Sequence, residues 1–282
     1  MPVSPAPAPY TPEIHGHRGC RGLAPENTLP AFRRALLLGV DVLELDVVLS
    51  ADNEVVVSHE PWMSAAFCLT PSGQPIPAEQ QFRHNLYAMP YATIRQYDCG
   101  SLRHPLFPEQ HSEPAFKPLL REVVAAADIF ADQLHRPRPR FSIEIKSSPE
   151  GDRIWHPEPA QFLKIVLNEL RTLDLLSRTT LLCFDKRILQ LAYGIVPELP
   201  LCLLVEDQRP PTAHLHELGF IPATYGPDFR LVTASLVAEL NSLQIHLVPW
   251  TVNELPDLRR MLAFRPRGIT TDYPDRLIDL LK

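Results

Sequence analysis

The stretch from Ile14 to His59, IHGHRGCRGLAPENTLPAFRRALLLGVDVLELDVVLSADNEVVVSH, decides the fold. It predicts a short strand leading into His17, an amphipathic helix over Leu29–Leu38 and a second strand over Val42–Val48. Gly39 directly follows the predicted helix, which is typical of a helix end. A strand, a helix and a second strand in this order indicate a βαβ unit with parallel strands.

The second predicted strand carries two acidic residues on one face. Side chains alternate along a strand, so Glu44 and Asp46 point the same way and lie close together. Buried carboxylates repel each other and are costly to desolvate, and the rest of this strand consists of Val and Leu. The pair therefore indicates a site for a metal or a substrate. A structural network with Arg and Lys is the alternative.

Strands and helices continue to alternate up to the carboxyl terminus. The eight predicted strands, most of them followed by a helix, cover Ile14–His17, Val42–Val48, Phe141–Lys146, Thr180–Phe184, Leu201–Val205, Thr224–Phe229, Ile245–Thr251 and Gly268–Thr271. This pattern in a chain of 282 residues, 45% of them hydrophobic, predicts an α/β protein with a TIM (β/α)8 barrel over residues 13–282. Enzymes with this fold carry out their chemistry at the carboxyl ends of the strands.

Residues 60–115 interrupt the alternation. The segment has little periodicity and is rich in Pro, Gln and His, and it follows His59 at the mouth of the predicted barrel. We expect an insertion between the second strand region and its helix. Because the segment contains many aromatic residues, which are scarce in disordered linkers, we expect a folded cap over the site.

The order of the polar residues resembles the glycerophosphodiester phosphodiesterase family, in the superfamily of phospholipase C-like TIM barrels. The motifs that carry the resemblance are His17-Arg18-Gly19, Pro25-Glu26-Asn27-Thr28, Glu44-Leu45-Asp46-Val47 and a His59 that ends a Val-rich run. The resemblance implies metal-dependent hydrolysis of glycerophosphodiesters to glycerol 3-phosphate and an alcohol. It implies one divalent cation on Glu44, Asp46 and Glu144. Oxygen ligands select Ca²⁺ or Mg²⁺, with Mn²⁺ as a further option.

The resemblance also implies roles for other residues. His17 and His59 match the catalytic histidines of the family and would act as general acid and base, because histidine titrates near neutral pH. The residues at substrate- or phosphate-binding positions are Arg18, Lys146, Glu26, Asn27, Phe184 and Trp250. Structural alternatives are an ion pair between Lys146 and Glu144, a helix cap for Asn27, and simple packing for the two aromatic residues.

The chain departs from the family pattern in three places. Glu60 follows His59 where Asp is usual, an Arg-Thr-Thr run is absent, and Cys183 stands before Phe184 where Ser is usual. We expect these changes to affect the contacts to the alcohol and not the metal or the histidines. The alternative function is a lysophospholipase D or a phosphoinositide-type phosphodiesterase. A non-catalytic phosphodiester-binding barrel and a sugar-phosphate isomerase barrel are disfavoured by the intact histidines and carboxylates.

Composition bears on partners and compartment. A net charge of −6 favours a small-molecule glycerophosphodiester over a nucleic acid as partner. No apolar run is long enough to span a membrane, and residues 1–12 predict a disordered lead-in without the features of a signal peptide. The five cysteines are scattered and odd in number. They predict no disulfide framework and favour a reducing, cytoplasmic location, or a periplasmic or secreted one if an export signal has been removed. The oligomeric state is not indicated.

Overall fold

Capping residues define the first helix and the loop before it. Strand β1 (Glu13–Gly16) is separated by this loop from helix α1 (Leu29–Leu38). The Thr28 side chain accepts a hydrogen bond from the Ala31 N–H and caps the start of α1, and Gly39 ends the helix with a φ of 110°. The loop is therefore held at the carboxyl end of β1.

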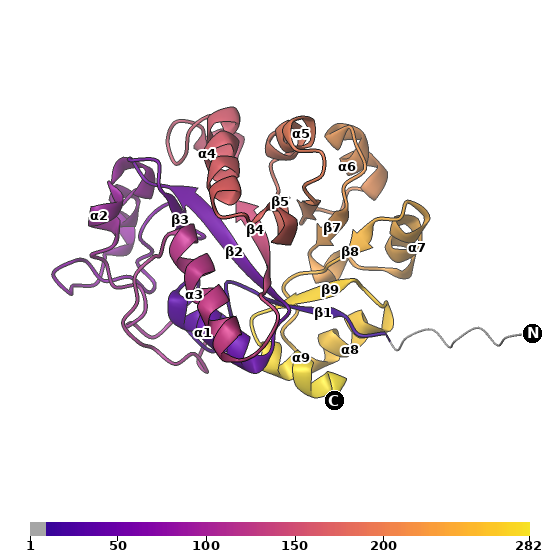
Figure 1. Cartoon of the computed structure of the whole chain (residues 1–282), viewed down its shortest axis with the longest axis horizontal. Helices are drawn as coiled ribbons and strands as arrows, with labels where there is room; N and C mark the ends of the chain where they lie inside the picture. Colours follow the sequence, from indigo (N-terminus) through magenta and orange to yellow (C-terminus); the bar gives the residue numbers. More distant parts are fainter. Residues whose placement is uncertain (1–9) are drawn as a thin grey trace, which may run out of the picture.

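The computed structural model describes residues 10–282, in which eight parallel strands form a barrel in the order β8-β7-β6-β5-β4-β2-β1-β9. The strands after β1 are β2 (Val42–Leu49), β4 (Arg140–Ile145), β5 (Thr179–Cys183), β6 (Leu201–Val205), β7 (Thr224–Pro227), β8 (His246–Leu247) and β9 (Gly268–Thr271). The helices after α1 on the outside of the barrel are α3 (Leu120–Gln133), α4 (Pro159–Thr172), α5 (Lys186–Ile195), α6 (Pro211–Leu218), α7 (Ala234–Ser242), α8 (Leu255–Ala263) and α9 (Pro274–Leu281). Figure 1 shows these helices around the strands. The predicted TIM barrel is confirmed.

The barrel closes between β8 and β9 through irregular backbone. Strand β8 is two residues long and pairs with β7 on its other side. Toward β9, the Leu247 carbonyl accepts a hydrogen bond from the Arg267 N–H at 2.8 Å, and the Pro249 carbonyl accepts one from the Thr270 N–H at 3.1 Å. These bonds take the place of a regular ladder and make the ring nearly continuous.

The Val-rich run before His59 forms strand β3 (Val55–Val57), which lies outside the parallel ring. It pairs antiparallel with β2. The reversal is a tight turn in which the Ser50 N–H donates to the Glu54 carbonyl at 3.1 Å. A connection this short can only return the chain antiparallel, because a parallel strand needs a long crossover. The hairpin brings His59 back beside the carboxyl end of β2.

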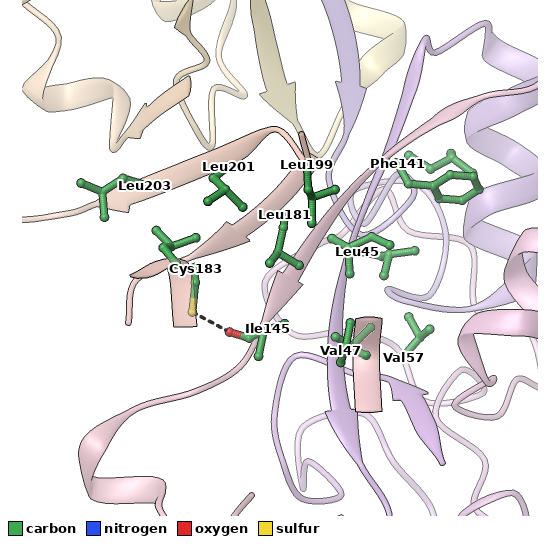
Figure 2. Close-up of a cluster of buried hydrophobic side chains, with 14 of the residues drawn as sticks. Leu45, Val47, Val57, Phe141, Ile145, Leu181, Cys183, Leu199, Leu201 and Leu203 are labelled. Carbon is green, nitrogen blue, oxygen red and sulfur yellow. Dashed lines mark hydrogen bonds between the residues drawn. The ribbon is translucent and has the colours of Figure 1, made fainter. Parts of the chain in front are cut away.

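The main hydrophobic core lies between the barrel and the helices. On β2, Leu43, Leu45 and Val47 alternate with the acidic residues and belong to this outer layer. Figure 2 shows the layer continuing over the neighbouring strands, with Phe141 on β4 and Leu181 on β5. Because the leucines and valines occupy the outward face, the polar residues of the same strands point into the barrel.

The insertion, residues 60–115, folds around a smaller hydrophobic cluster. Its residues Met63, Phe67, Ile76, Leu86 and Ile94 are buried against one face of β2 and β3. Its short helices are α2 (Tyr91–Ile94) and the 3₁₀ turns η1 (Ala78–Arg83) and η2 (Leu86–Ala88). The remaining 3₁₀ turns of the chain are η3 (Pro149–Gly151), η4 (Leu176–Arg178) and η5 (Phe229–Leu231). In Figure 1, α2 lies beside β3, outside the ring of helices.

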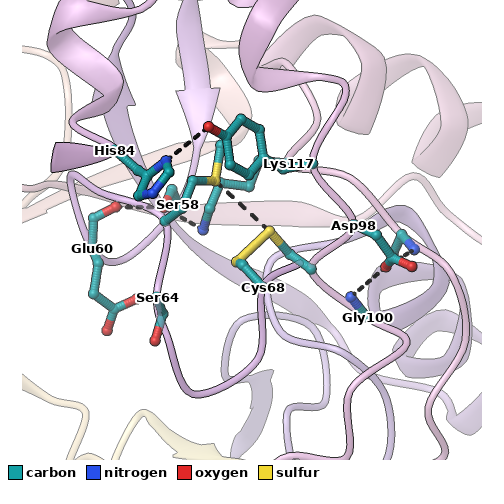
Figure 3. Close-up of a disulfide and its surroundings, with 12 residues drawn as sticks. Ser58, Glu60, Ser64, Cys68, His84, Asp98, Gly100 and Lys117 are labelled. Atoms are coloured by element: carbon teal, nitrogen blue, oxygen red, sulfur yellow. Dashed lines mark hydrogen bonds between the residues drawn. A yellow bond between two sulfur atoms is a disulfide. The ribbon is translucent and has the colours of Figure 1, made fainter. Parts of the chain in front are cut away.

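A disulfide joins Cys68 to Cys99 within the insertion (Figure 3). The prediction that the cysteines form no disulfide was therefore wrong. The two residues are 31 positions apart and belong to no spacing motif, so their pairing depends on the fold of the insertion. Disulfides persist in oxidising compartments. Because two of the five cysteines are paired, the cysteines no longer support the prediction of a reducing location.

The described part of the chain begins at Tyr10, which contacts the segment before β9. Residues 1–9 of the predicted lead-in, 1–12, are outside the described residues. Directly after them, the Tyr10 hydroxyl donates a hydrogen bond to the Pro266 carbonyl at 2.7 Å. No helix within residues 10–282 is long and apolar enough to cross a membrane.

Candidate active site

A cavity of about 600 Å³ occupies the barrel interior. At the carboxyl ends of the strands it is lined by His17, His59 and Glu144, and at the amino ends by Glu13 and Arg140. Many TIM barrels fill this space with branched apolar side chains. Here the inward face is largely polar on β1, β2 and β4, so most of the predicted site residues line an open space, and Glu26, Asn27 and Asp46 lie behind them.

Three carboxylates meet at the carboxyl ends of β2 and β4. Glu44 and Asp46 alternate on β2, and Asp46 lies opposite Glu144 in the ladder between the two strands. One oxygen of each carboxylate lies within 4.8 Å of the others, and all three residues are buried. Burial and the neighbouring Asp46 charge raise the pKa of Glu44 well above its ordinary value. Burial likewise raises the pKa of Glu144, although Lys146 opposes the shift.

The donor set fits a hard divalent cation. The three residues supply only carboxylate oxygens, the ligands that such cations prefer. Asp46 Oδ1 is buried and has no hydrogen-bond partner among the described residues. A buried acceptor without a partner is costly, and a cation would satisfy it. The cluster could therefore bind one divalent cation.

Arg18 and Lys146 lie beside the triad. Arg18 Nη1 contacts Glu26 Oε1 at 2.7 Å and its Nε lies 3.3 Å from Asp46 Oδ2, while its backbone N–H donates to Glu44 Oε2 at 2.8 Å. Lys146 Nζ lies 2.7 Å from Glu144 Oε1. The structure thus shows the ion pair that was the alternative for Lys146. The Arg18 and Lys146 side chains nevertheless line the cavity and could turn toward a phosphate.

Asn27 holds a triad residue and does not cap α1. Its Nδ2 donates to Asp46 Oδ2 at 2.9 Å. Thr28 occupies the capping position, so the helix-cap alternative for Asn27 was wrong. Asn27 has a φ of 55°, a left-handed conformation that asparagine adopts more readily than most residues.

His17 is oriented by a carboxylate from the last strand. Its Nδ1 forms a 2.6 Å hydrogen bond with Asp272 Oδ1, and its Nε2 lies 3.9 Å from Glu44 Oε2. Two Arg21 nitrogens donate to the two Asp272 oxygens, at 3.0 and 3.1 Å. Asp272 directly follows β9 and was not among the residues predicted for the site. The pairing of β1 with β9 brings Asp272 and His17 together.

His59 has a carboxylate partner of its own. Its Nδ1 lies 2.9 Å from Glu60 Oε1. Burial alone would raise the pKa of Glu60, but the hydrogen bond and charge of His59, with Lys117 and Arg18 nearby, lower it to about 2. We expected the departure at Glu60 to leave the histidines untouched, and this was wrong, because Glu60 is the residue that contacts the His59 ring.

The opposite wall of the cavity is apolar. Phe184 and Trp250 pack edge to face with ring centres 5.5 Å apart, against buried Leu182, Cys202 and Leu204. The Trp250 indole N–H donates to the Gly226 carbonyl at 2.7 Å, which fixes the ring at the cavity edge. Both predicted aromatic residues therefore pack and also face the cavity.

The insertion flanks the mouth of the barrel. The Gln110 side chain donates to the Arg21 carbonyl at 2.7 Å, and the Phe107 ring lies 4.6 Å from the Arg21 guanidinium carbon. The insertion also contacts the loop between β4 and α4, where the centres of the Trp62 and Trp155 rings are 5.0 Å apart. Within the described part of the chain, no residue between 60 and 115 lines the cavity. The insertion thus supports the loops around the site from the side.

Comparisons with known proteins concern the family and the fold of the chain. Residues 17–276 match the model of the glycerophosphoryl diester phosphodiesterase family. A glycerophosphodiester phosphodiesterase of Bacillus subtilis (strain 168) is 27% identical over 92% of this chain and 83% of its own length. A crystal structure from Silicibacter pomeroyi DSS-3, provisionally named a glycerophosphoryl diester phosphodiesterase, superposes with a TM-score of 0.84 and is 32% identical, over 96% of this chain and 95% of its own. An Oleispira antarctica phosphodiesterase in complex with the product sn-glycerol-3-phosphate shares the fold, with a TM-score of 0.74 and 19% identity over 96% of each chain.

Proposed function

Because this chain belongs to the glycerophosphoryl diester phosphodiesterase family, we propose that it hydrolyses glycerophosphodiesters to glycerol 3-phosphate and an alcohol. The observation that carries the proposal is the arrangement of the buried acidic triad beside two histidines. Each histidine binds a separate carboxylate through Nδ1 and leaves Nε2 for a substrate. The glycerol 3-phosphate bound by the Oleispira antarctica relative supports the assignment of the product.

Glu44, Asp46 and Glu144 would hold one Ca²⁺ or Mg²⁺ ion, with Mn²⁺ as a further option. When bound, the cation polarises a phosphoryl oxygen and lowers the cost of the charge that builds up on it. Arg18 and Lys146 would stabilise the same charge on the other phosphate oxygens, since both line the cavity next to the triad. Glu26 and Asn27 act indirectly, by holding Arg18 and Asp46.

The two histidines would divide the proton transfers. His17 lies deep beside Glu44, where it would take a proton from the attacking hydroxyl, either of water or of the glycerol of the substrate. His59 lies at the mouth with its side chain 31% exposed, where it would donate a proton to the departing alcohol as the phosphorus–oxygen bond breaks. Phe184 and Trp250 would contact the organic part of the substrate.

The apolar wall supports a second candidate, hydrolysis of lysophospholipids in the manner of a lysophospholipase D. Leu182, Leu204 and Val248 line the cavity below Phe184 and Trp250, and they would suit a substrate with an apolar group. The chemistry at phosphorus would be the same. The two candidates differ in which substrate has the higher kcat/KM.

A substrate panel tests these proposals. Glycerophosphocholine, glycerophosphoethanolamine, glycerophosphoinositol and lysophosphatidylcholine would each be assayed for the released alcohol and phosphate ester. We expect turnover that is abolished by EDTA and restored by Ca²⁺ or Mg²⁺. His17→Ala and His59→Ala should each lower kcat by roughly 10² or more. Tight binding without turnover of any member would instead indicate a non-catalytic phosphodiester-binding barrel, and full activity in excess EDTA would refute the metal site.

A further inference from the structure

A buried lysine lies beside strand β3, which leads to His59. Lys117 is 4% exposed and precedes Leu119, which forms a bridge with Val56 of β3. Its Nζ donates to Ser58 Oγ at 2.8 Å, the one hydrogen bond that this ammonium makes within residues 10–282. Burial of a charged group with so few partners is costly, so Lys117 calls for a specific explanation.

Hydrogen bonds connect Lys117 to the His59 ring. Ser58 Oγ accepts from Lys117 and donates to the Glu60 carbonyl at 2.6 Å, and Glu60 Oε1 lies 2.9 Å from His59 Nδ1. Figure 3 labels Lys117, Ser58 and Glu60 together, next to the disulfide. The second Glu60 oxygen, Oε2, is buried and has no hydrogen-bond partner in the described structure. The Glu60 carboxylate therefore depends on nearby positive charge.

The charges of Lys117 and Glu60 stabilise each other. Burial lowers the pKa of Lys117, and the negative charges of Glu60 and Glu26 oppose this shift. Lys117 in turn is among the groups that keep Glu60 anionic. An anionic Glu60 accepts a hydrogen bond from His59 Nδ1–H, so that Nε2 faces the cavity and is the nitrogen that would carry the proton passed to the departing alcohol.

We propose that Lys117 is a positioning residue for this reaction: its buried ammonium holds Ser58 and Glu60 in place, and Glu60 thereby fixes the His59 ring toward the substrate. The proposal rests on the proposed phosphodiesterase activity. Its rival is a purely structural role, in which Lys117 anchors the insertion through the Phe67 ring, 5.6 Å from Nζ. The rival predicts lower stability without a specific effect on His59.

The test is a double-mutant cycle with a matched control. Lys117→Met keeps the length of the side chain and removes its charge, and Lys186→Met does the same at a lysine that pairs with Glu217 on the outer helices. We expect Lys117→Met to lower kcat by roughly 10-fold, the scale of a lost supporting partner, with KM changed by less than about 2-fold. Lys186→Met should leave both unchanged. In a His59→Ala background, Lys117→Met should cost almost nothing further, because its effect passes through that ring.

An equal loss of kcat in both backgrounds would overturn the proposal. If Lys117→Met does not fold, Ser58→Ala keeps the ammonium and the packing, and it should show the same dependence on His59 with a smaller loss. A readout without turnover separates this proposal from the proposed function. In ¹⁵N-histidine NMR spectra, the neutral form of His59 should be the Nδ1–H tautomer in the wild type and lose that preference in Lys117→Met only. An unchanged tautomer would refute the positioning role even if the activity itself were absent.

Discussion

Glu44→Gln should make the metal-free protein more stable while abolishing metal binding. In the folded chain one Glu44 oxygen lies within 4.8 Å of oxygens of Asp46 and Glu144. Gln removes the charge but keeps an oxygen that can accept the 2.8 Å hydrogen bond from the Arg18 N–H. The substitution therefore relieves repulsion with little loss of packing.

The size of the effect follows from Coulomb's law. Two unit charges 4.8 Å apart repel by about 3.5 kcal/mol at an effective dielectric constant of about 20. Arg18 and Lys146 offset much of this repulsion, so we expect a net gain of about 1–2 kcal/mol, or about 3–6 °C in Tm. The gain should increase with pH. Because the pKa of Glu44 is raised in the folded state, the wild type loses stability as rising pH removes that proton.

Thermal unfolding of both proteins at pH 8, in EDTA and in excess Ca²⁺ or Mg²⁺, is the measurement. The wild type should have the lower Tm in EDTA and gain stability with the cation, whereas Glu44→Gln should start higher and gain little. If the variant were less stable than the wild type in EDTA, repulsion within the triad would not be the dominant interaction. If both proteins gained equally from the cation, the cation would bind elsewhere.

Two further substitutions test the groups around the cavity. Asp272→Asn should lower kcat by roughly 10²–10⁴ with little change in KM, because the amide no longer selects the correct His17 tautomer. Steady-state kinetics measure this loss, and a decrease in kcat of less than about threefold would contradict the role of Asp272. Burial alone would raise the pKa of Glu13, but hydrogen bonds with His15 and Arg140 lower this pKa from 4.5 to about 2. The ionised Glu13 therefore contributes stability that is present above pH 4.5 and lost as the pH falls toward 2. Urea unfolding at pH 6 and pH 3 should therefore show a larger acid loss for the wild type than for Glu13→Gln, and equal losses would refute the assignment.

Local periodicity was enough to predict the barrel and the acidic pair. The period of two along β2 places Glu44 and Asp46 on one face and the leucines on the other, whatever the rest of the chain does. Capping and turn residues mark the ends of the helices in the same way. The order of the polar motifs then indicated the family, and with it the third carboxylate on β4. All of these signals lie within single elements or in their order along the chain.

The partners of the histidines depended on the closed barrel. His17 and Asp272 are 255 positions apart and meet because β1 pairs with β9, while Cys68 and Cys99 meet because the insertion folds back on itself. Glu60 is adjacent to His59 in sequence, yet its hydrogen bond to the His59 ring was not predicted, because adjacency along the chain does not say which way two side chains turn after the hairpin of β2 and β3. Side-chain alternation is a property of one strand and can be read locally. A hydrogen bond between distant residues also needs their positions in space, which only the packing of the whole chain provides.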